Sequence, residues 1–416
     1  MKWWIAACVV AGLALRLAFG LLYWTNQPLT HDEREYLALA RSVARGDGFQ
    51  YPADEPVPGT AQRFGRAPGY PIFLAALRVT TPVEHVPRRV KVAQAIVGSI
   101  AIWLVASIAT RAAGRRAGAV AGAIAAVYPP LVWLPAYAWS ETLYSTVALA
   151  AARTLQEAGA GNRDTHRFAK TGSVPVSVLA GGLLTAIAVL IRPAMVFFVP
   201  LAVGWMLRRR RAVDAAAFVL VATLCVVPWT IRNHRVYGRW IAVASEGGVT
   251  FWTGNHPLAR GDGDLAANPE LKRAELAFRE AHPGLTPESL EPLYYRDALG
   301  WIGAHPARWI ALVARKAFYT VVPIGPSYTL HSARYVAASV ASYAAILIAA
   351  IAGARRWLKR THTAASASPA PLWIMAAATV LAGLVFFPQE RFRLPVIDPA
   401  LIVTASLVAA SRDRER

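Results

Sequence analysis

Ten apolar stretches, each long enough or nearly long enough to cross a bilayer as a helix, constrain this chain more than any other feature. A spanning helix needs about 20 mostly apolar residues, and in lipid its backbone polar groups must pair within the segment itself. Only 16% of the 416 residues are charged, against roughly 25% in soluble domains. The sequence therefore predicts an all-α polytopic membrane protein, with spans near residues 3–24, 91–110, 117–134, 138–153, 174–191, 194–207, 213–231, 334–353, 371–387 and 394–411.

The lysines and arginines assign an orientation to these spans. Ten spans with a cytoplasmic N-terminus place 19 of the 44 Lys and Arg in short inner segments, among them Arg208–Arg211 and the tail 412–416. This is the bias that the positive-inside rule describes. The loops 25–90 and 232–308 then lie outside and hold 16 of the 24 acidic residues. We expect residues 1–411 to form one transmembrane domain, with both termini cytoplasmic and the polar chemistry on the outer side.

Two further apolar segments leave the number of spans open. Residues 70–83 are too short to cross, which favours a re-entrant or interfacial helix. Residues 308–324 carry Arg315 and Lys316 at their centre. Each charge facing lipid would cost about 2.5–3.5 kcal/mol on insertion scales, so we expect an amphipathic helix on the outer surface.

The first outer loop contains a strong local signal for a helix over about 31–45. Thr30 and Glu33 form a T-x-x-E capping box, and Gly46 or Gly48 ends the helix. Its apolar and basic residues fall on opposite faces, a pattern typical of a helix lying on a membrane surface.

Asp32 and Glu33 occupy the first turn of this helix, where two interpretations compete. Acids in a first turn stabilise the helix dipole, and this role alone accounts for the pair. The functional alternative is a carboxylate held at the water–lipid boundary, where it takes a proton from an acceptor hydroxyl or amine.

Short motifs along the chain resemble a known family. They begin with His31-Asp-Glu-x-x-Tyr-x-x-x-Ala40 and Gly65-Arg-Ala-Pro-Gly-Tyr-Pro71. Further motifs follow in the order expected for that family, as far as the last span. The chain resembles bacterial glycosyltransferases with the GT-C fold, and more narrowly the branch of protein O-mannosyltransferases and lipid A aminoarabinose transferases (glycosyltransferase family 39). Larger members carry more spans or a soluble C-terminal domain. The later motifs are Trp139–Leu143, Ile191–Pro193, Pro228–Asn233, Glu246–Gly248, Gly254–Asn255 and Gln389–Pro395.

This resemblance implies a reaction. A hexosyl or pentosyl group would pass, with inversion, from a polyprenyl-phosphate carrier to a glycan, lipid or protein acceptor at the outer face of the membrane. Asp32 matches the acidic residue that family members use as general base, and Glu33 is the neighbour that tunes it. The leaving phosphate is ionised at neutral pH, so no general acid is needed, unlike the carboxylate pair of glycosidases.

Four arginines at the outer ends of spans are candidates for binding the donor phosphate. A guanidinium group offers a planar fork of donors that fits phosphate oxygens and keeps its charge near lipid. The alternative is snorkelling to the lipid headgroups, the usual fate of an arginine at a span end. The candidates are Arg192, Arg232, Arg391 and Arg393. A further arginine, Arg16, lies well inside the first span and is expected to face the bundle interior.

Seven other residues within the motifs or the outer loops are candidates for contact with the sugar or the acceptor. Loops on a rigid scaffold commonly carry binding residues, but a solvated loop or a helix cap explains several of them equally well. The candidates are Tyr36, Arg66, Tyr70, Glu141, Glu246, Asn255 and His256.

Two other functional classes compete with an enzyme. A flippase or transporter of lipid-linked sugars places ionisable groups at mid-membrane in repeated halves; here the polar residues cluster at one face and no repeat is evident. The second is a non-catalytic membrane subunit of an envelope assembly. No metal-binding or nucleotide motif stands in a suitable context, so no cofactor is expected, although some GT-C enzymes use a divalent ion and that alternative stays open. The expected partners are the lipid-linked donor, the acceptor and membrane lipids, without nucleic acid, in a bacterial inner membrane.

Overall fold

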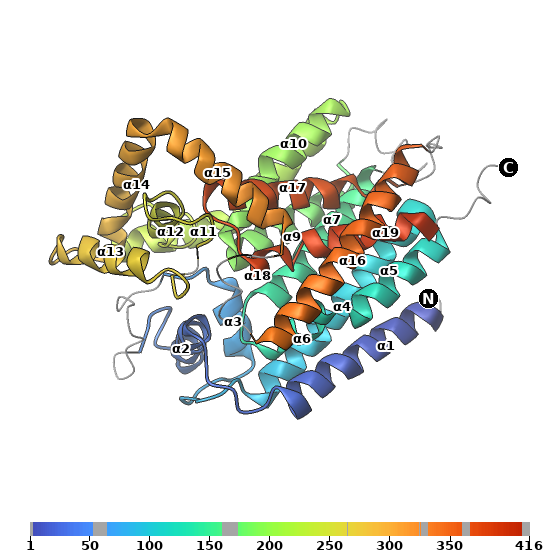
Figure 1. Cartoon of the computed structure of the whole chain (residues 1–416), viewed down its shortest axis with the longest axis horizontal. Coiled ribbons are helices and arrows are strands. Elements are labelled where there is room, and N and C mark those ends of the chain that lie inside the picture. The colour runs from blue at the N-terminus through green and yellow to red at the C-terminus, as the bar shows by residue number, and fades with distance from the viewer. Residues whose placement is uncertain are drawn as a thin grey trace.

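The computed structural model describes residues 3–52, 65–159, 174–263, 265–323, 325, 332–359 and 367–409. The secondary structure of these residues is helical (Figure 1). A bundle of long helices occupies one side of the molecule, and a group of shorter helices lies beside one end of it. The predicted tail 412–416 lies outside the described residues.

Each of the ten predicted apolar stretches coincides with helical structure. In chain order these are α1 (Trp3–Ala18) with its π-helical extension (Phe19–Tyr23), α4 (Arg88–Ala113), α5 (Arg115–Val127) with α6 (Pro129–Trp133) and a 3-10 turn (Leu134–Ala136), α7 (Glu141–Gly159), α9 (Val176–Ile191), a 3-10 turn (Pro193–Phe197) with α10 (Phe198–Arg208), α11 (Ala212–Tyr237), α16 (Ala333–Leu358), α17 (Ala370–Val385), and α19 (Ile397–Ser406) with a 3-10 turn (Leu407–Ala409).

Four helical segments among the described residues are long and apolar enough to cross a membrane: Trp3–Tyr23, α4, α11 and α16. A fifth is added if α5 and the following Pro129–Ala136, which bend by 62° at Tyr128, form one span. Other apolar helices, such as α9 and α17, are shorter. The chain is thus an all-α polytopic membrane protein, while the number ten and the orientation stay predictions.

Small residues let the bundle helices approach closely. A Cβ atom on Gly118 of α5 would overlap the hydroxyl of Thr110 and crowd the carbonyl oxygen of Ala106, both on α4. Ala121 and Ala125 on the same side of α5 are fully buried. Because lipid is as apolar as a leucine side chain, such close contact between small residues is a main source of helix association in membranes.

Arg16 faces the bundle interior, as predicted, and its role follows from the break between α5 and α6. Its guanidinium donates hydrogen bonds to the carbonyl oxygens of Ala125 (3.2 Å) and Ala126 (3.3 Å). In a continuous helix these carbonyls would accept from residues 129 and 130, but both are prolines and have no N–H group. Arg16 therefore supplies the donors that the two prolines remove.

The shorter helices form a second group beside the bundle: α2 (His31–Arg45), α3 (Gly69–Ala76), α12 (Gly247–Gly254), α13 (Pro269–Glu280), α14 (Pro287–Ala304) and α15 (Pro306–Val321). In Figure 1, α12 to α15 lie together at one end of the bundle, with α2 and α3 next to them. Trp252 of α12 packs with Leu271, Leu290 and Tyr294 in a separate apolar core. The segment 70–83, predicted to be interfacial or re-entrant, contains only the two turns of α3.

The helix predicted over 31–45 is present with both its predicted ends. The Thr30 hydroxyl accepts from the Glu33 amide, the Glu33 carboxylate accepts from the Thr30 amide, and Gly46 ends the helix at φ 89°. Its position on the membrane surface stays a prediction, but its faces are not divided as expected. Arg41, expected on a solvated face, is buried, and so are Leu37 and Leu39, which pack into different apolar clusters. Most of the helix therefore packs against the rest of the protein, while His31, Arg34 and Arg45 are exposed.

The prediction for 308–324 is half right. The helix α15 is amphipathic and Arg315 is exposed, but Lys316 is completely buried. Its amine donates to Asn255 Oδ1 (3.0 Å) and to the carbonyl oxygen of Leu384 (3.1 Å), near the end of α17. The last carbonyls of a helix have no partner within it, so a buried amine is well placed there.

Candidate active site

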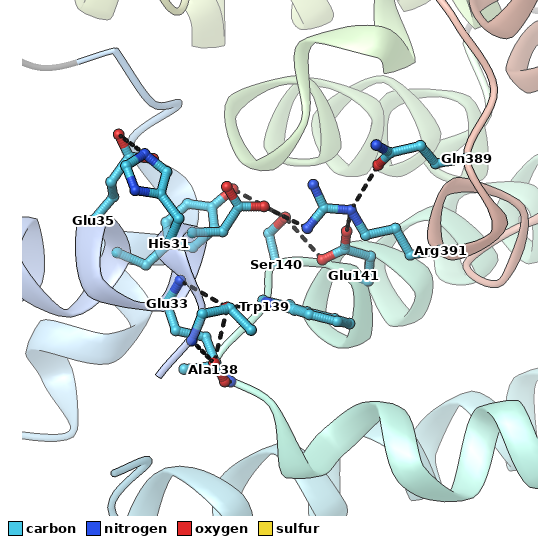
Figure 2. A network of polar contacts seen from close by, with 12 residues as sticks. His31, Glu33, Glu35, Ala138, Trp139, Ser140, Glu141, Gln389 and Arg391 are labelled. Carbon is cyan, nitrogen blue, oxygen red and sulfur yellow. Dashed lines mark hydrogen bonds and ion pairs between the residues drawn. The ribbon is translucent and has the colours of Figure 1, made fainter. Parts of the chain in front are cut away.

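Four carboxylates and three arginines meet where several helices begin or end. Positive and negative groups alternate along the cluster: Arg66 and Arg391 each contact two or more carboxylates, and Arg192 contacts Glu141. Figure 2 shows part of this network, with Arg391 directed toward Glu141. The seven residues are Asp32, Glu35, Arg66, Glu141, Arg192, Glu246 and Arg391. We call them the charged cluster.

Helix ends deliver these side chains. Asp32 is in the first turn of α2, Glu141 is the first residue of α7, and Glu246 immediately precedes α12. Arg192 follows the last residue of α9. Acids at helix starts and bases at helix ends are the arrangement that the helix dipole favours. Arg391 comes from the short helix α18 (Glu390–Arg393).

Asp32 is held by two arginines. Its Oδ1 accepts from Arg66 Nη2 at 2.5 Å, and its Oδ2 pairs with Arg391. Burial raises the pKa of Asp32, but the positive charges of Arg391 and Arg66 outweigh burial and hold this pKa well below its usual range. Asp32 is therefore ionised, with both oxygens already occupied by charge-assisted hydrogen bonds.

Glu141 joins Arg192 to Arg391. Its Oε1 lies 2.6 Å from Arg192 Nη1 and 3.9 Å from Arg391 Nε. The ring of Phe392 lies between the two guanidinium groups, 4.7 Å from that of Arg192 and 5.2 Å from that of Arg391. The Arg391 guanidinium also lies 5.4 Å from the centre of the Trp139 ring. Aromatic faces attract cations, so these rings help to fix the two arginine forks.

Arg66 connects Asp32 to two further carboxylates. Its Nε donates to Glu35 at 2.6 Å, and the same atom lies 3.3 Å from Glu246 Oε1. The Arg66 guanidinium also lies 5.3 Å from the ring of Tyr36. Glu35 is nearly inaccessible, whereas 34% of the Glu246 side chain is exposed. Burial is the main cause that raises the pKa of Glu246 to about 7; Arg66 lowers it, and the carboxylates of Glu35 and Asp32 raise it.

Glu33, predicted to tune Asp32, points elsewhere. Its carboxylate accepts from the Thr30 amide (2.7 Å) and from the Ala138 amide (2.8 Å). Figure 2 shows it beside Ala138, apart from Arg391 and Glu141. Glu33 thus connects the start of α2 to the segment before α7 through these two hydrogen bonds.

Tyr36 and Tyr70 lie behind the charged cluster. The Tyr36 hydroxyl donates to Ser140 Oγ at 3.4 Å, and its ring meets that of Tyr70 edge to face. Tyr70 is fully buried and donates to Gln94 at 2.9 Å. The Tyr36 ring therefore packs against the Arg66 guanidinium, and the Tyr70 ring packs against Tyr36.

Two of the four predicted phosphate-binding arginines do not join the cluster. Arg232 lies among the rings of Phe49, Trp229 and Tyr237. Arg393 is buried, 2.8 Å from Asp398 Oδ1 and stacked over a tyrosine ring. Arg232 thus contacts its own helix α11 and the segment after α2, and Arg393 contacts α19. Arg192 and Arg391 remain as candidates for binding the donor phosphate.

Asn255 and His256 also lie outside the charged cluster. Asn255 is buried, donates to the Val385 carbonyl oxygen (2.9 Å) and accepts from Trp309 and Lys316. His256 packs against the ring of Trp252, and burial lowers its pKa. Their placement gives them a structural role at the junction of α12, α15 and α17.

The sequence analysis missed several residues in or next to the charged cluster. Glu35 is the most important of them, and a signal existed, because positions 32 and 35 lie on one face of a predicted helix. Ser140 and Gln389 carried no comparable signal: Ser140 accepts from Arg192 at 3.4 Å and Gln389 accepts from Arg391 at 3.0 Å.

Within the described part of the chain, no group of three or more His, Cys, Asp or Glu has the arrangement of a metal site. The carboxylates of the charged cluster face guanidinium groups, which already provide the positive charge that a cation would bring. Whether a divalent ion takes part stays open as a prediction, and no step below depends on one.

No protein-family model matches this chain, and no curated protein matches it in sequence. Solved structures do match. The Archaeoglobus fulgidus oligosaccharyltransferase in its apo form covers 100% of this chain and 51% of its own, at TM-score 0.60 and 15% identity. The A. fulgidus oligosaccharyltransferase AglB, in complex with an inhibitory peptide and a dolichol-phosphate, covers 98% of this chain and 50% of its own, at TM-score 0.58 and 15% identity.

At this identity the likeness shows the fold alone. The described chain has the GT-C fold that the motif resemblance predicts, and it spans about half the length of the oligosaccharyltransferase. Lipid A aminoarabinose transferase ArnT from Cupriavidus metallidurans, bound to undecaprenyl phosphate, also matches, at 15% identity, covering 98% of this chain and 78% of its own. Its TM-score of 0.46 adds nothing to the fold assignment.

Proposed function

We propose that this chain is a glycosyltransferase that moves a hexosyl or pentosyl group from a polyprenyl-phosphate carrier to a hydroxyl or amine of a glycan, lipid or protein acceptor. The observation that carries the proposal is the charged cluster: three guanidinium groups interleaved with carboxylates at the helix ends of a GT-C fold. A structure of AglB contains a dolichol-phosphate, which is a ligand of the class proposed here.

Arg192 and Arg391 are the residues proposed to bind the donor phosphate. Their guanidinium groups flank one aromatic ring and share one carboxylate, Glu141, so they are fixed close together. A phosphate oxygen competes well for such donors because a guanidinium fork matches its geometry and stays charged at any physiological pH. Stabilising the charge that develops on the leaving phosphate is the largest contribution that preorganised donors make to a transfer of this kind.

Asp32 organises the arginines. Its two oxygens bridge Arg66 and Arg391, which places the phosphate side and the acceptor side of the cluster at a set separation. The family resemblance also assigns it the role of general base. A substitution that removes its charge should strongly reduce transfer under either role, because Arg66 and Arg391 would lose their common partner.

We further propose that the protein resides in a bacterial inner membrane, with both termini cytoplasmic and the charged cluster at the outer face. The support is that the clusters of Lys and Arg between the predicted spans all fall on the same side of the membrane. Cysteine labelling from the outside tests this orientation: a single cysteine near Trp139 should react in intact spheroplasts, and one in the Arg208–Arg211 turn should not.

The decisive experiment incubates the purified full-length protein with undecaprenyl-phosphate hexoses and pentoses and a mixture of envelope acceptors. Mass spectrometry then follows the released carrier phosphate and the modified acceptor. The Asp32→Asn variant should bind undecaprenyl phosphate but release it from the donors far more slowly than wild type. Glu280→Gln, at an exposed acid on α13, should behave as wild type. A flippase would move the donor across vesicles and be indifferent to Asp32→Asn, a result that contradicts the proposal.

A further inference from the structure

The charged cluster contains one more acid than base. Four carboxylates face three guanidinium groups, so one carboxylate lacks a full positive partner when all are ionised. An uncompensated carboxylate near other carboxylates gains affinity for a proton. The question is which of the four it is.

Three of the four are committed to arginine. Asp32 gives one oxygen to Arg66 and the other to Arg391. Glu35 accepts from two nitrogens of Arg66 and is 4% exposed. Glu141 pairs with Arg192 and is 2% exposed. An acid that is paired in this way, or closed off from solvent, is a poor acceptor of a substrate proton.

Glu246 differs from the other three. Within the described residues, the polar contact of its side chain is the 3.3 Å approach of Oε1 to Arg66 Nε, the longest ion-pair contact that Arg66 makes. It precedes α12 but its side chain does not cap that helix. It packs over Gly65, where a Cβ atom would lie 2.6 Å from Oε1, so the glycine provides its space. It is also the most exposed acid of the cluster.

We propose that Glu246, and not Asp32, accepts the proton of the acceptor's hydroxyl or amine. The inference rests on the proposed function and specifies one of its steps. Glu246 sits at the solvent-reachable end of the charged cluster, linked through Arg66 to Asp32 and through Asp32 to Arg391. Asp32 then acts as a positioning residue for the two arginines.

The step balances without any further reactant. The acceptor O–H or N–H bond breaks and its proton moves to a Glu246 oxygen. The electron pair of that bond forms the new bond to the anomeric carbon of the sugar. The bond from that carbon to the phosphate oxygen breaks, and its electron pair stays on the carrier phosphate beside Arg391 and Arg192. Glu246 later returns the proton to water.

The charges that face Glu246 fit this role. Partial burial is the main cause that raises its pKa; Arg66 lowers it, and Glu35 and Asp32 from α2 and Glu291 from α14 raise it, with a result of about 7. A base works best when its pKa is near the working pH. Because Glu246 must be ionised to accept the proton, turnover should rise as the pH increases through about 7.

Infrared difference spectroscopy of the full chain in nanodiscs tests the site without a substrate. A protonated-carboxyl band should titrate with a midpoint of about 7, in place of the usual 4.5, and should vanish in Glu246→Gln but persist in the control Glu280→Gln. A Glu246 band that titrates near 4.5 overturns the inference.

Kinetics with undecaprenyl-phosphate mannose and undecaprenyl-phosphate arabinose test the step itself. We expect Glu246→Gln to lose about 10²- to 10⁴-fold in kcat, the usual size of a general-base effect, with unchanged binding of undecaprenyl phosphate and no remaining rise in rate through about pH 7. Glu246→Asp should recover part of the rate. Residual turnover of Asp32→Asn should keep the rise.

The outcomes separate the two proposals. If wild type transfers sugar and Glu246→Gln does so at the same rate, or keeps the same pH profile, Glu246 is not the base and the proposed function stands. If the rise in rate disappears in Asp32→Asn and remains in Glu246→Gln, Asp32 is the base. If wild type transfers neither probe, the proposed function fails and the assignment of Glu246 fails with it.

Discussion

Replacing Lys316 by methionine should change how the stability of this protein depends on pH. The Lys316 amine is wholly buried and pairs with Asn255 Oδ1 and the Leu384 carbonyl oxygen, both neutral acceptors. Burial lowers its pKa from 10.5 to about 7. Methionine has a similar length and no charge, so Lys316→Met removes the titration while filling the space.

The sign follows from proton binding. Between about pH 7 and 10.5 the unfolded chain binds a proton at Lys316 that the folded chain does not, so the free energy of unfolding of wild type rises with pH in this window. Each pH unit contributes roughly 1.4 kcal/mol, or roughly 3 kcal/mol from pH 7 to pH 9. Methionine also leaves the α17 carbonyls without a donor, which costs about 1–3 kcal/mol at any pH.

Lys316→Met should therefore be clearly less stable than wild type at pH 9, and this deficit should shrink by roughly 3 kcal/mol, or reverse, at pH 7. Thermal unfolding in detergent at both pH values, with hydrogen–deuterium exchange of α15 and the end of α17, measures the difference. Lys359→Met, at an exposed lysine after α16, is the control. A deficit of the same size at both pH values would refute the reasoning, because it would show that the Lys316 amine does not titrate between them.

Three further substitutions test other contacts. Arg391→Lys keeps the charge beside Asp32 but loses the planar fork, so affinity for undecaprenyl phosphate should fall about tenfold or more in a direct binding assay. Arg16→Met leaves two carbonyl oxygens without donors and should lower the free energy of unfolding by about 2–5 kcal/mol, measured by thermal unfolding, without changing carrier binding. Gly254→Ala would drive a Cβ atom into the carbonyl oxygen of Phe386 and shift the turn that leads to Arg391, so we expect both thermal stability and carrier affinity to drop. An unchanged affinity or stability in one of these assays would contradict the role given to the corresponding contact.

Local sequence determined the helices and their ends. The capping box at Thr30 and Glu33 depends on groups three residues apart, and Gly46 adopts a backbone conformation that glycine favours, so both were predictable. The apolar stretches likewise predicted the helices of the bundle, because the need to pair backbone groups in lipid is a property of each segment. The interior position of Arg16 followed from the same cost of exposing charge to lipid.

Helix geometry explains the errors within the site. Residues one or two apart on a helix point in different directions, about 100° and 200° around its axis. The side chain of Glu33 therefore points away from that of Asp32, and that of Arg393 away from that of Arg391, although each pair lies within one motif. Glu35, three residues after Asp32, shares its face and joins it on Arg66.

What only the tertiary structure decided is which charges meet. Asp32 and Arg391 lie 359 positions apart in the chain, and no local pattern couples them. The order of the motifs placed both residues near helix ends. How the helices pack decides which arginines join Asp32 and which, such as Arg232 and Arg393, make separate contacts. The energy of a charge pair falls as the distance grows, and salt screens it beyond roughly 10 Å. The pKa shifts of Asp32 and Glu246 therefore arise only once packing has brought their partners close.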